Sequence, residues 1–195
     1  MAEVINLRKG DKVAVGFTNI TVGLGWEPNE GTGAEFDLDV SAILIDANRK
    51  IPSKDYFVFF NNLKSPDGSV THTGDDPDGK SSDGDDDESL IIDLTKINSN
   101  IQEILFVVTI NDAVQNKQNF GQVRDSYIRL VDNNNGNEVM KYELGEDFSI
   151  ETGIEFGRLY RRNNEWKFDA SGVGYKEDLK FFIDKYLPNN ITTQN

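Results

Sequence analysis

The segment ILFVVTI, residues 104–110, is the most hydrophobic stretch of the chain, and its composition predicts a buried β-strand. Two other segments also predict buried β-structure. YFVFF, residues 56–60, is apolar throughout, as expected of a central strand that is covered on both faces. LIIDL, residues 90–94, shows the alternation of a strand. We therefore expect a core built from β-sheet.

Further strands are predicted on both sides of these segments. Alternation and turn residues indicate three hairpins: residues 11–17 with 20–24, residues 126–131 with 138–144, and residues 154–161 with 165–170. The second hairpin encloses the Asn135-Gly136 step, which is a strong turn signal. Residues 35–45 begin with strict alternation and predict one more strand.

One helix is predicted, over residues 176–187, and Pro188 ends it. Its apolar positions recur at the spacing of one helix face: Leu179, Phe182, Ile183, Tyr186 and Leu187. About nine or ten short strands followed by this helix favour a mainly β fold, a two-sheet antiparallel β-sandwich with a C-terminal amphipathic α-helix. We expect a single domain over residues 1–188 and a flexible tail over residues 189–195.

The densest charge of the chain lies between YFVFF and LIIDL. Residues 71–89 (THTGDDPDGKSSDGDDDES) carry eight acidic side chains against Lys80 alone, a net charge of −7 in a chain of −14. At about 5 Å and an effective dielectric of about 20, each pair of like charges costs roughly 3 kcal/mol. Because predicted core strands hold both ends of this loop, we favour a cation site over the alternative, a disordered and solvated acidic run.

Calcium is the cation that such a loop suits, because it takes about 6–8 oxygen ligands in flexible geometry. The loop does not match an EF-hand, since Glu88 stands where a Gly belongs and Leu94 stands where the bidentate Glu belongs. On the strand at residues 35–45, Asp37 and Asp39 share one face, where they either flank an ion or face water. The pair at residues 61 and 62 predicts either a turn or neutral carbonyl ligands.

Composition excludes several other classes of protein. The chain has no Cys and one His, which excludes disulfides, Cys-ligated zinc, iron–sulfur clusters and His-rich metal sites. The net charge of −14 argues against a nucleic-acid partner. No apolar run approaches the ~20 residues of a membrane helix, and the start MAEVINLRKG lacks the apolar segment of a signal peptide. We expect a cytoplasmic protein without a transmembrane segment.

Seven segments, taken together and in order, resemble the tellurium-resistance TerD family of bacterial calcium-binding stress proteins. They are GLGW at residues 23–26, FDLDVSA at 36–42, FFNNLKSPDGSVTHTGDD from 59, DGDDDESL from 83, ILFVVTINDA from 104, NFGQV from 119 and LYRRNNEWKF from 159. The resemblance covers roughly residues 7–187. It implies a calcium-binding β-sandwich in a cytoplasmic protein linked to tellurite and general stress resistance.

Carried onto this chain, the resemblance implies about two Ca²⁺ ions and a set of metal ligands. They are Asp37, Asp39, Asn61, Asn62, Gly74, Asp75, Asp85, Asp86, Asp87 and Glu88. The loop departs from the family pattern at Asp76 and at Lys80-Ser81-Ser82, and we leave Asp76, Asp78 and Asp83 outside the set for that reason.

Other functions remain open at this stage. Clustered carboxylates could hold two metals in a hydrolase or act as the acid pair of a glycosidase, although we expect no enzyme. A calcium-dependent module could instead bind a partner or the inner face of the membrane. Apart from calcium ions, we expect other stress-response proteins as partners.

Overall fold

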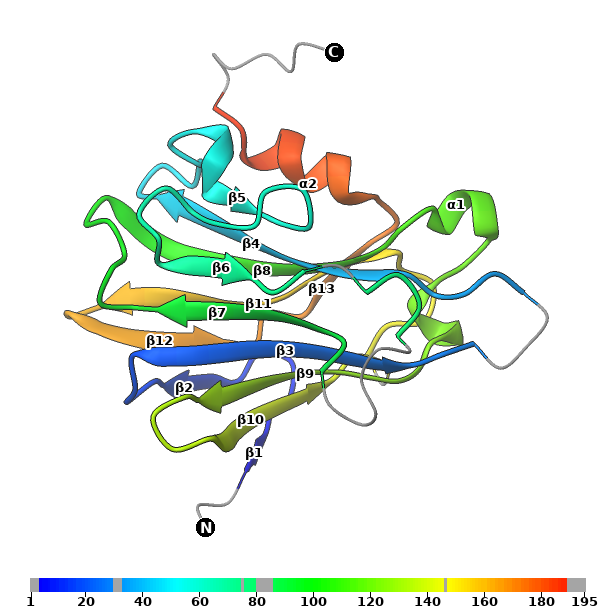
Figure 1. Ribbon diagram of the computed structural model, residues 1–195, viewed down its shortest axis with the longest axis horizontal. Coiled ribbons are helices and arrows are strands. Elements are labelled where there is room, and N and C mark those ends of the chain that lie inside the picture. Colours follow the sequence, from blue (N-terminus) through cyan, green and yellow to red (C-terminus); the bar gives the residue numbers. More distant parts are fainter. Residues whose placement is uncertain (1–3, 30–32, 75, 80–85, 146, 189–195) are drawn as a thin grey trace.

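The computed structural model describes residues 4–29, 33–74, 76–79, 86–145 and 147–188, and within them the chain forms two facing sheets (Figure 1). The first sheet contains, in spatial order, β1 (Ile5–Asn6), β10 (Asn137–Glu143), β9 (Arg124–Asp132), β3 (Asn19–Glu27), β7 (Glu88–Asp93) and β6 (Val70–His72). The second contains β2 (Lys12–Ala14), β12 (Glu165–Asp169), β11 (Gly153–Arg162), β8 (Ile101–Ile110), β4 (Leu38–Asp46) and β5 (Phe57–Val58), with β13 (Val173–Tyr175) on β11. The predicted β-sandwich is confirmed.

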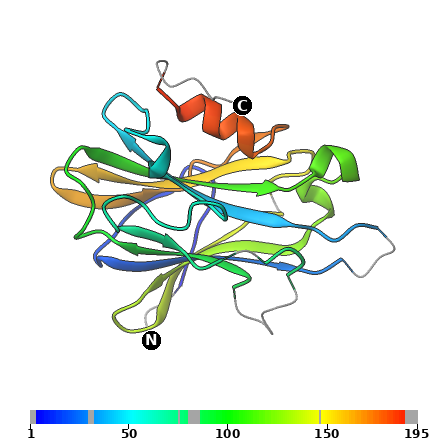
Figure 2. The same cartoon turned by 45° about the horizontal axis from the view of Figure 1, so that its top comes forward.

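Four helical segments join or cover these strands: the 3₁₀ turns η1 (Lys54–Tyr56) and η2 (Phe120–Gln122), and the α-helices α1 (Ala113–Asn116) and α2 (Leu179–Tyr186). Figure 2 shows α2 on the outer side of the second sheet. The side chain of Asp178 caps α2 by accepting a hydrogen bond from the Phe181 N–H at 3.0 Å. The predicted C-terminal helix is therefore confirmed. Within the described residues, no helix has the length and apolar character to cross a membrane.

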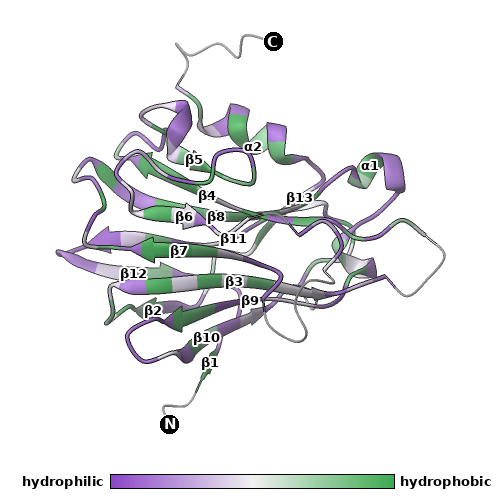
Figure 3. Ribbon diagram, in the orientation of Figure 1, coloured by the Kyte–Doolittle hydropathy of each residue, from purple (hydrophilic) through white to green (hydrophobic). Residues whose placement is uncertain are grey.

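The core lies between the two sheets and consists of apolar residues from the strands of both. Figure 3 shows these hydrophobic stretches along the strands of each sheet. β8 is the centre of the core, as the hydrophobicity of residues 104–110 predicts. Phe106 of β8 stacks on Phe156 of β11 with ring centroids 5.6 Å apart, and both are fully buried. The register of β8 with β4 and β11 follows from this burial, because a shift by one residue would turn the apolar face outward.

Two of the three predicted hairpins are confirmed, and the first is wrong. β9 pairs with β10, and β11 pairs with β12, as expected. Residues 11–17 and 20–24 do not pair with each other. β2 joins β12 in the second sheet, whereas β3 joins β7 and β9 in the first, so the chain crosses from one sheet to the other around residue 18. Alternation identified both strands but carried no information about their partners.

The prediction of a central strand at residues 56–60 is also wrong. Only Phe57 and Val58 form a strand, and β5 lies at the edge of the second sheet beside β4. Contacts outside the sheet help to cover this apolar segment, because Phe57 and Phe59 line a common apolar cleft with Ile183 of α2. The acidic segment consequently connects β6 to β7, two strands of the first sheet, and β6 was not predicted.

Candidate metal centre

Several of the predicted ligand segments meet at one end of the sandwich. β4 starts there just after Asp37, whose carbonyl accepts a hydrogen bond from the Asn111 N–H at 2.8 Å, beyond the end of β8. From the first sheet, the Asp87 N–H donates to the Leu24 carbonyl at 2.8 Å near the end of β3. The end of the acidic segment at Asp87 is thus fastened to β3, whereas its start follows β6 and not, as the sequence had predicted, residues 56–60.

The first structural feature of this end is the open edge of β4. β8 pairs with β4 along one side, while β5 pairs on the other side only at Ala42 and Ile43. At Val40, side chains from the first sheet take the place of a neighbouring strand. The Val40 N–H donates to Glu88 Oε2 at 2.8 Å, and His72 Nε2 lies 3.1 Å from the Val40 carbonyl oxygen. We call these three residues the inter-sheet clamp, because they join the two sheets through hydrogen bonds.

Hydrogen bonds also indicate the protonation of His72 in the clamp. The Gly74 N–H donates to His72 Nδ1 at 3.1 Å, so Nδ1 is an acceptor. Nε2 then carries the proton and donates to the Val40 carbonyl, with Glu88 Oε2 3.5 Å away. This arrangement corresponds to a neutral imidazole, and Gly74 adopts a φ of 128° in doing so, a conformation that favours glycine.

Glu88 is the most deeply buried acid of the site, with a side chain that is 0% exposed. Its Oε1 accepts from the Asp76 N–H at 3.3 Å, so both carboxylate oxygens receive backbone hydrogen bonds. Burial raises the pKa of Glu88, against the opposing effects of His72 and the backbone donors. The carboxylate therefore positions the acidic segment against β4.

Asp86 makes a second set of structural contacts, with Arg129 and Tyr127 of β9. Its Oδ1 accepts from Arg129 Nε at 2.8 Å and from the Tyr127 hydroxyl at 3.3 Å. The carboxylate lies directly over Gly23, where a Cβ atom would approach it to 2.0 Å. Burial, together with the charge of Asp86, raises the pKa of Tyr127 to about 12. Gly23, part of the GLGW segment, is thus required for space rather than for backbone conformation.

Three further predicted ligands at this end lie beside these contacts. Asp87 Oδ2 accepts from the Trp26 N–H at 2.9 Å. Asp37 Oδ2 accepts from Asn111 Nδ2 at 2.9 Å. Asp39 lies within β4 opposite Thr109 and is 4% exposed. These three carboxylates come from both sheets, and each has oxygen lone pairs of the kind that calcium binds.

The asparagine pair lies in the turn after β5. Asn62 Nδ2 donates to the carbonyls of Asp55 and Phe57 at 3.0 and 2.7 Å, and the Asn62 backbone pairs with Phe59. Asn61 is exposed in the same turn. The turn interpretation of the sequence is therefore confirmed, while a ligand role for either side chain stays a prediction.

Two of the predicted ligands, Asp75 and Asp85, lie outside the described residues. Within the part of the chain that the structure describes, no three acidic or His side chains are grouped closely enough to hold a metal ion. The ten-residue ligand set consequently stays a prediction. The sequence placed His72 in the acidic run as a turn or packing residue, and its burial agrees with packing, but its contact with Val40 was not predicted. The buried alternation of Val70 and His72 in β6 was the available signal.

The chain is similar to known proteins over nearly its whole length. The TerD domain model matches residues 3–186. The tellurium resistance protein TerD of Serratia marcescens is 48% identical over 187 residues, which covers 93% of this chain and 96% of that protein. General stress protein 16U of Bacillus subtilis is 45% identical over 188 residues, with 93% and 96% covered.

Solved structures agree on the fold. A homologue of telluride resistance protein (TerD) from Streptomyces coelicolor superimposes with a TM-score of 0.73 at 18% identity. The match covers 89% of this chain and 100% of that one. At this identity the likeness concerns the β-sandwich alone.

Proposed function

The chain belongs to the TerD family of tellurium resistance and general stress proteins, and on that premise we propose that it acts by binding calcium at the acidic end of the sandwich. The observation that carries this proposal is the inter-sheet clamp. His72 at the start of the acidic segment and Glu88 at its end both contact Val40, one residue from Asp39. The described ends of a segment that carries half of the chain's net charge are thereby held beside Asp39 of β4.

The candidate ligands divide into two groups by their contacts. Asp37, Asp39 and Asp87, with Asp75, Asp85 and the Gly74 carbonyl, are the oxygens that we propose as ligands. Glu88, whose two oxygens both accept backbone hydrogen bonds, and Asp86, which is paired with the Arg129 guanidinium, would mainly position them. Asn61 and Asn62 stay candidate neutral ligands. Bound calcium would supply positive charge that balances the carboxylates.

We propose a binding role and no catalysis. The relatives described above are named as resistance and stress proteins. The Asn111 side chain and the Trp26 N–H fix the carboxylates of Asp37 and Asp87, which suits fixed oxygen ligands better than groups that exchange protons. The readout of the calcium state would be a change in stability or in partner binding.

A contact with an anionic membrane is a second candidate role, and one observation favours it. Val114 of α1 is 85% exposed, so an apolar side chain projects close to Asn111, the partner of Asp37. Calcium would neutralise the acidic end and allow Val114 to enter the interface. Sedimentation with phosphatidylserine vesicles should then require calcium and should weaken in Val114→Asp. Equal sedimentation with chelator would contradict this role.

The calcium proposal is tested by isothermal titration of calcium into chelator-stripped protein, with magnesium as competitor. We expect saturable binding of one or two ions, lost in Asp39→Asn/Asp87→Asn. Glu165→Gln, at an exposed acid at the start of β12, is the control and should bind as the parent does. At a calcium concentration of 100 times Kd, one site should stabilise the fold by about 2.7 kcal/mol. Absence of binding at millimolar calcium would contradict the proposal.

A further inference from the structure

A cleft of about 420 Å³ opens between α1, the start of α2 and the adjoining ends of β4 and β8. Its floor consists of the buried residues Asp39, Thr109, Ile110 and Ala113. Its rim is exposed and acidic, with Asp112 on one side and Glu177 and Asp178 on the other, before α2. The cleft therefore has acids at two depths, one at the floor and three at the rim.

The charge and polarity of this lining favour a cation that also has an apolar part. Four carboxylates and a single ammonium group, that of Lys180, line the cleft. Phe60, Ile110, Val114 and Leu179 supply apolar surface between them. One water takes a volume of about 30 Å³, so the cleft is much larger than a bare ion needs. A small organic cation fits this combination better than an ion does.

Thr109 gives an independent indication of a ligand at the floor. Its side chain is 2% exposed, and its hydroxyl has no hydrogen-bond partner among the described residues. Thr109 is paired in register with Asp39, so the two side chains lie on the same face of the second sheet. A buried hydroxyl without a partner costs free energy, and a ligand that donates a hydrogen bond would remove that cost.

We propose that this cleft binds a small aliphatic diamine or polyamine. One ammonium group donates to the Thr109 hydroxyl and the Asp39 carboxylate at the floor, since an ammonium has three donors and both groups accept. The methylene chain lies along Ile110 and Leu179. The second ammonium reaches the rim at Glu177 and Asp178. The proposal does not rest on calcium binding, although Asp39 belongs to both sites.

Isothermal titration of 1,4-diaminobutane into the full chain tests the proposal, first with chelator and then with calcium. We expect one saturable site and no binding of 1,4-butanediol, which has a similar length without charge. Thr109→Val, of nearly the same shape, should weaken binding about tenfold, the value of one hydrogen bond to a charged group. Thr109→Ser should restore it. Thermal unfolding of each variant checks that the fold is retained.

Charge controls separate this site from general attraction to an acidic protein. Glu177→Gln at the rim should weaken binding about threefold, as expected of an exposed ion pair, and Glu165→Gln at the opposite end of β11 should leave it unchanged. Equal effects of the two variants, binding of the diol, or no saturation at millimolar diamine would overturn the proposal. Magnesium binding that depends on Thr109, without diamine binding, would overturn it in favour of an inorganic ion. Neither Glu177 nor Thr109 is a proposed calcium ligand, so the two proposals can fail separately.

Discussion

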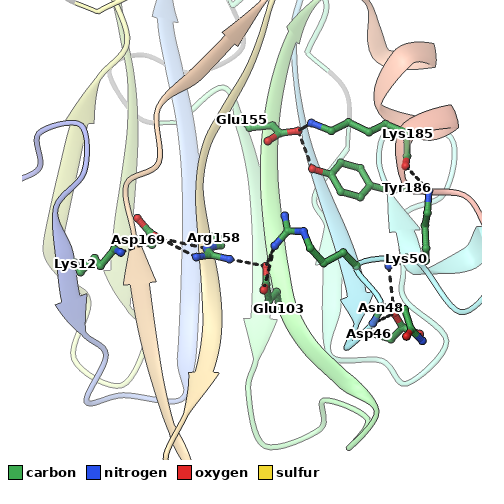
Figure 4. A network of polar contacts seen from close by, with 11 residues as sticks. Lys12, Asp46, Asn48, Lys50, Glu103, Glu155, Arg158, Asp169, Lys185 and Tyr186 are labelled. Carbon is green, nitrogen blue, oxygen red and sulfur yellow. Dashed lines mark hydrogen bonds and ion pairs between the residues drawn. The ribbon is translucent and has the colours of Figure 1, made fainter.

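Among the described residues, two regions contain buried or half-buried carboxylates, and the partners of these carboxylates differ. On the outer face of the second sheet, Glu103, Asp169 and Glu155 meet permanent cations (Figure 4). Arg158 bridges Glu103 and Asp169 at 2.9 and 3.0 Å, and Lys185 of α2 pairs with Glu155. At the acidic end, Glu88 instead meets the backbone N–H groups of Val40 and Asp76 and a neutral His72.

The difference indicates what each region depends on. Ion pairs between side chains balance charge locally and persist as long as the strands that carry them are paired. Hydrogen bonds from backbone N–H groups hold the Glu88 carboxylate without supplying a counter-charge, so its position depends on the conformation of one connection. The carboxylates of the first region have counter-charges from the protein, whereas in the second region the calcium that we propose would supply the counter-charge for the remaining acids.

The largest expected effect comes from removing the clamp carboxylate. Glu88→Ala leaves the Val40 and Asp76 N–H groups buried without an acceptor, and each loss costs about 1–3 kcal/mol. We expect urea unfolding to show a loss of roughly 3 kcal/mol. Glu88→Gln keeps an acceptor for Val40 and should lose less. A loss below about 1 kcal/mol in Glu88→Ala would show that the clamp does not join the sheets.

The next largest loss of stability is expected from substitution of Gly23, which lies beneath the Asp86 carboxylate. In Gly23→Ala the new Cβ would meet the Asp86 carboxylate at 2.0 Å, so Asp86 must leave Arg129 or the strand must move. Overpacking of this kind costs about 1–3 kcal/mol. Gly16→Ala is a matched control, because nothing lies within 4 Å of a Cβ there. Equal thermal stability of the two variants would be inconsistent with the close contact of Asp86 and Gly23.

Removing a charge from the ion-paired region on the outer face of the second sheet should lower the stability of the fold without changing calcium affinity. Arg158→Met removes the bridge between Glu103 and Asp169 and should cost about 1–2 kcal/mol, discounted because the arginine is 26% exposed. Calcium affinity in the same variant should equal that of the parent protein. A parallel loss of affinity would mean that the two regions are coupled.

The smallest effect concerns the titration of Tyr127. Its pKa of about 12 lies above the ordinary value of 10.0, so the folded state keeps this proton while the unfolded state releases it. Tyr127 therefore contributes a loss of stability as pH rises from 10 toward 12. Asp86→Asn should lower this pKa only in part, since burial is the larger cause. Tyrosinate absorbance, compared with Tyr127→Phe, measures it, and an unchanged pKa in Asp86→Asn would exclude the role of Asp86.

Local patterns in the sequence determined much of the architecture. The Asn135-Gly136 turn, the strands around it and the capped helix α2 follow from rules that operate over a few residues. The acidity of residues 71–89 and the absence of Cys limited the chemistry to oxygen ligands in the same way. Such features are predictable because the interacting groups are neighbours in the chain.

Tertiary structure alone decided which strands became partners. Alternation assigns a side chain to a face but carries no information about the neighbouring strand, so residues 11–17 and 20–24 were paired wrongly and β5 was placed at the centre. The inter-sheet clamp shows the same limit. Glu88 meets Val40 across 48 residues of sequence, and β4 needs that carboxylate only because β5 is too short to cover its edge. An unpaired backbone N–H becomes costly once it is buried, and which groups are buried is a property of the assembled sheets.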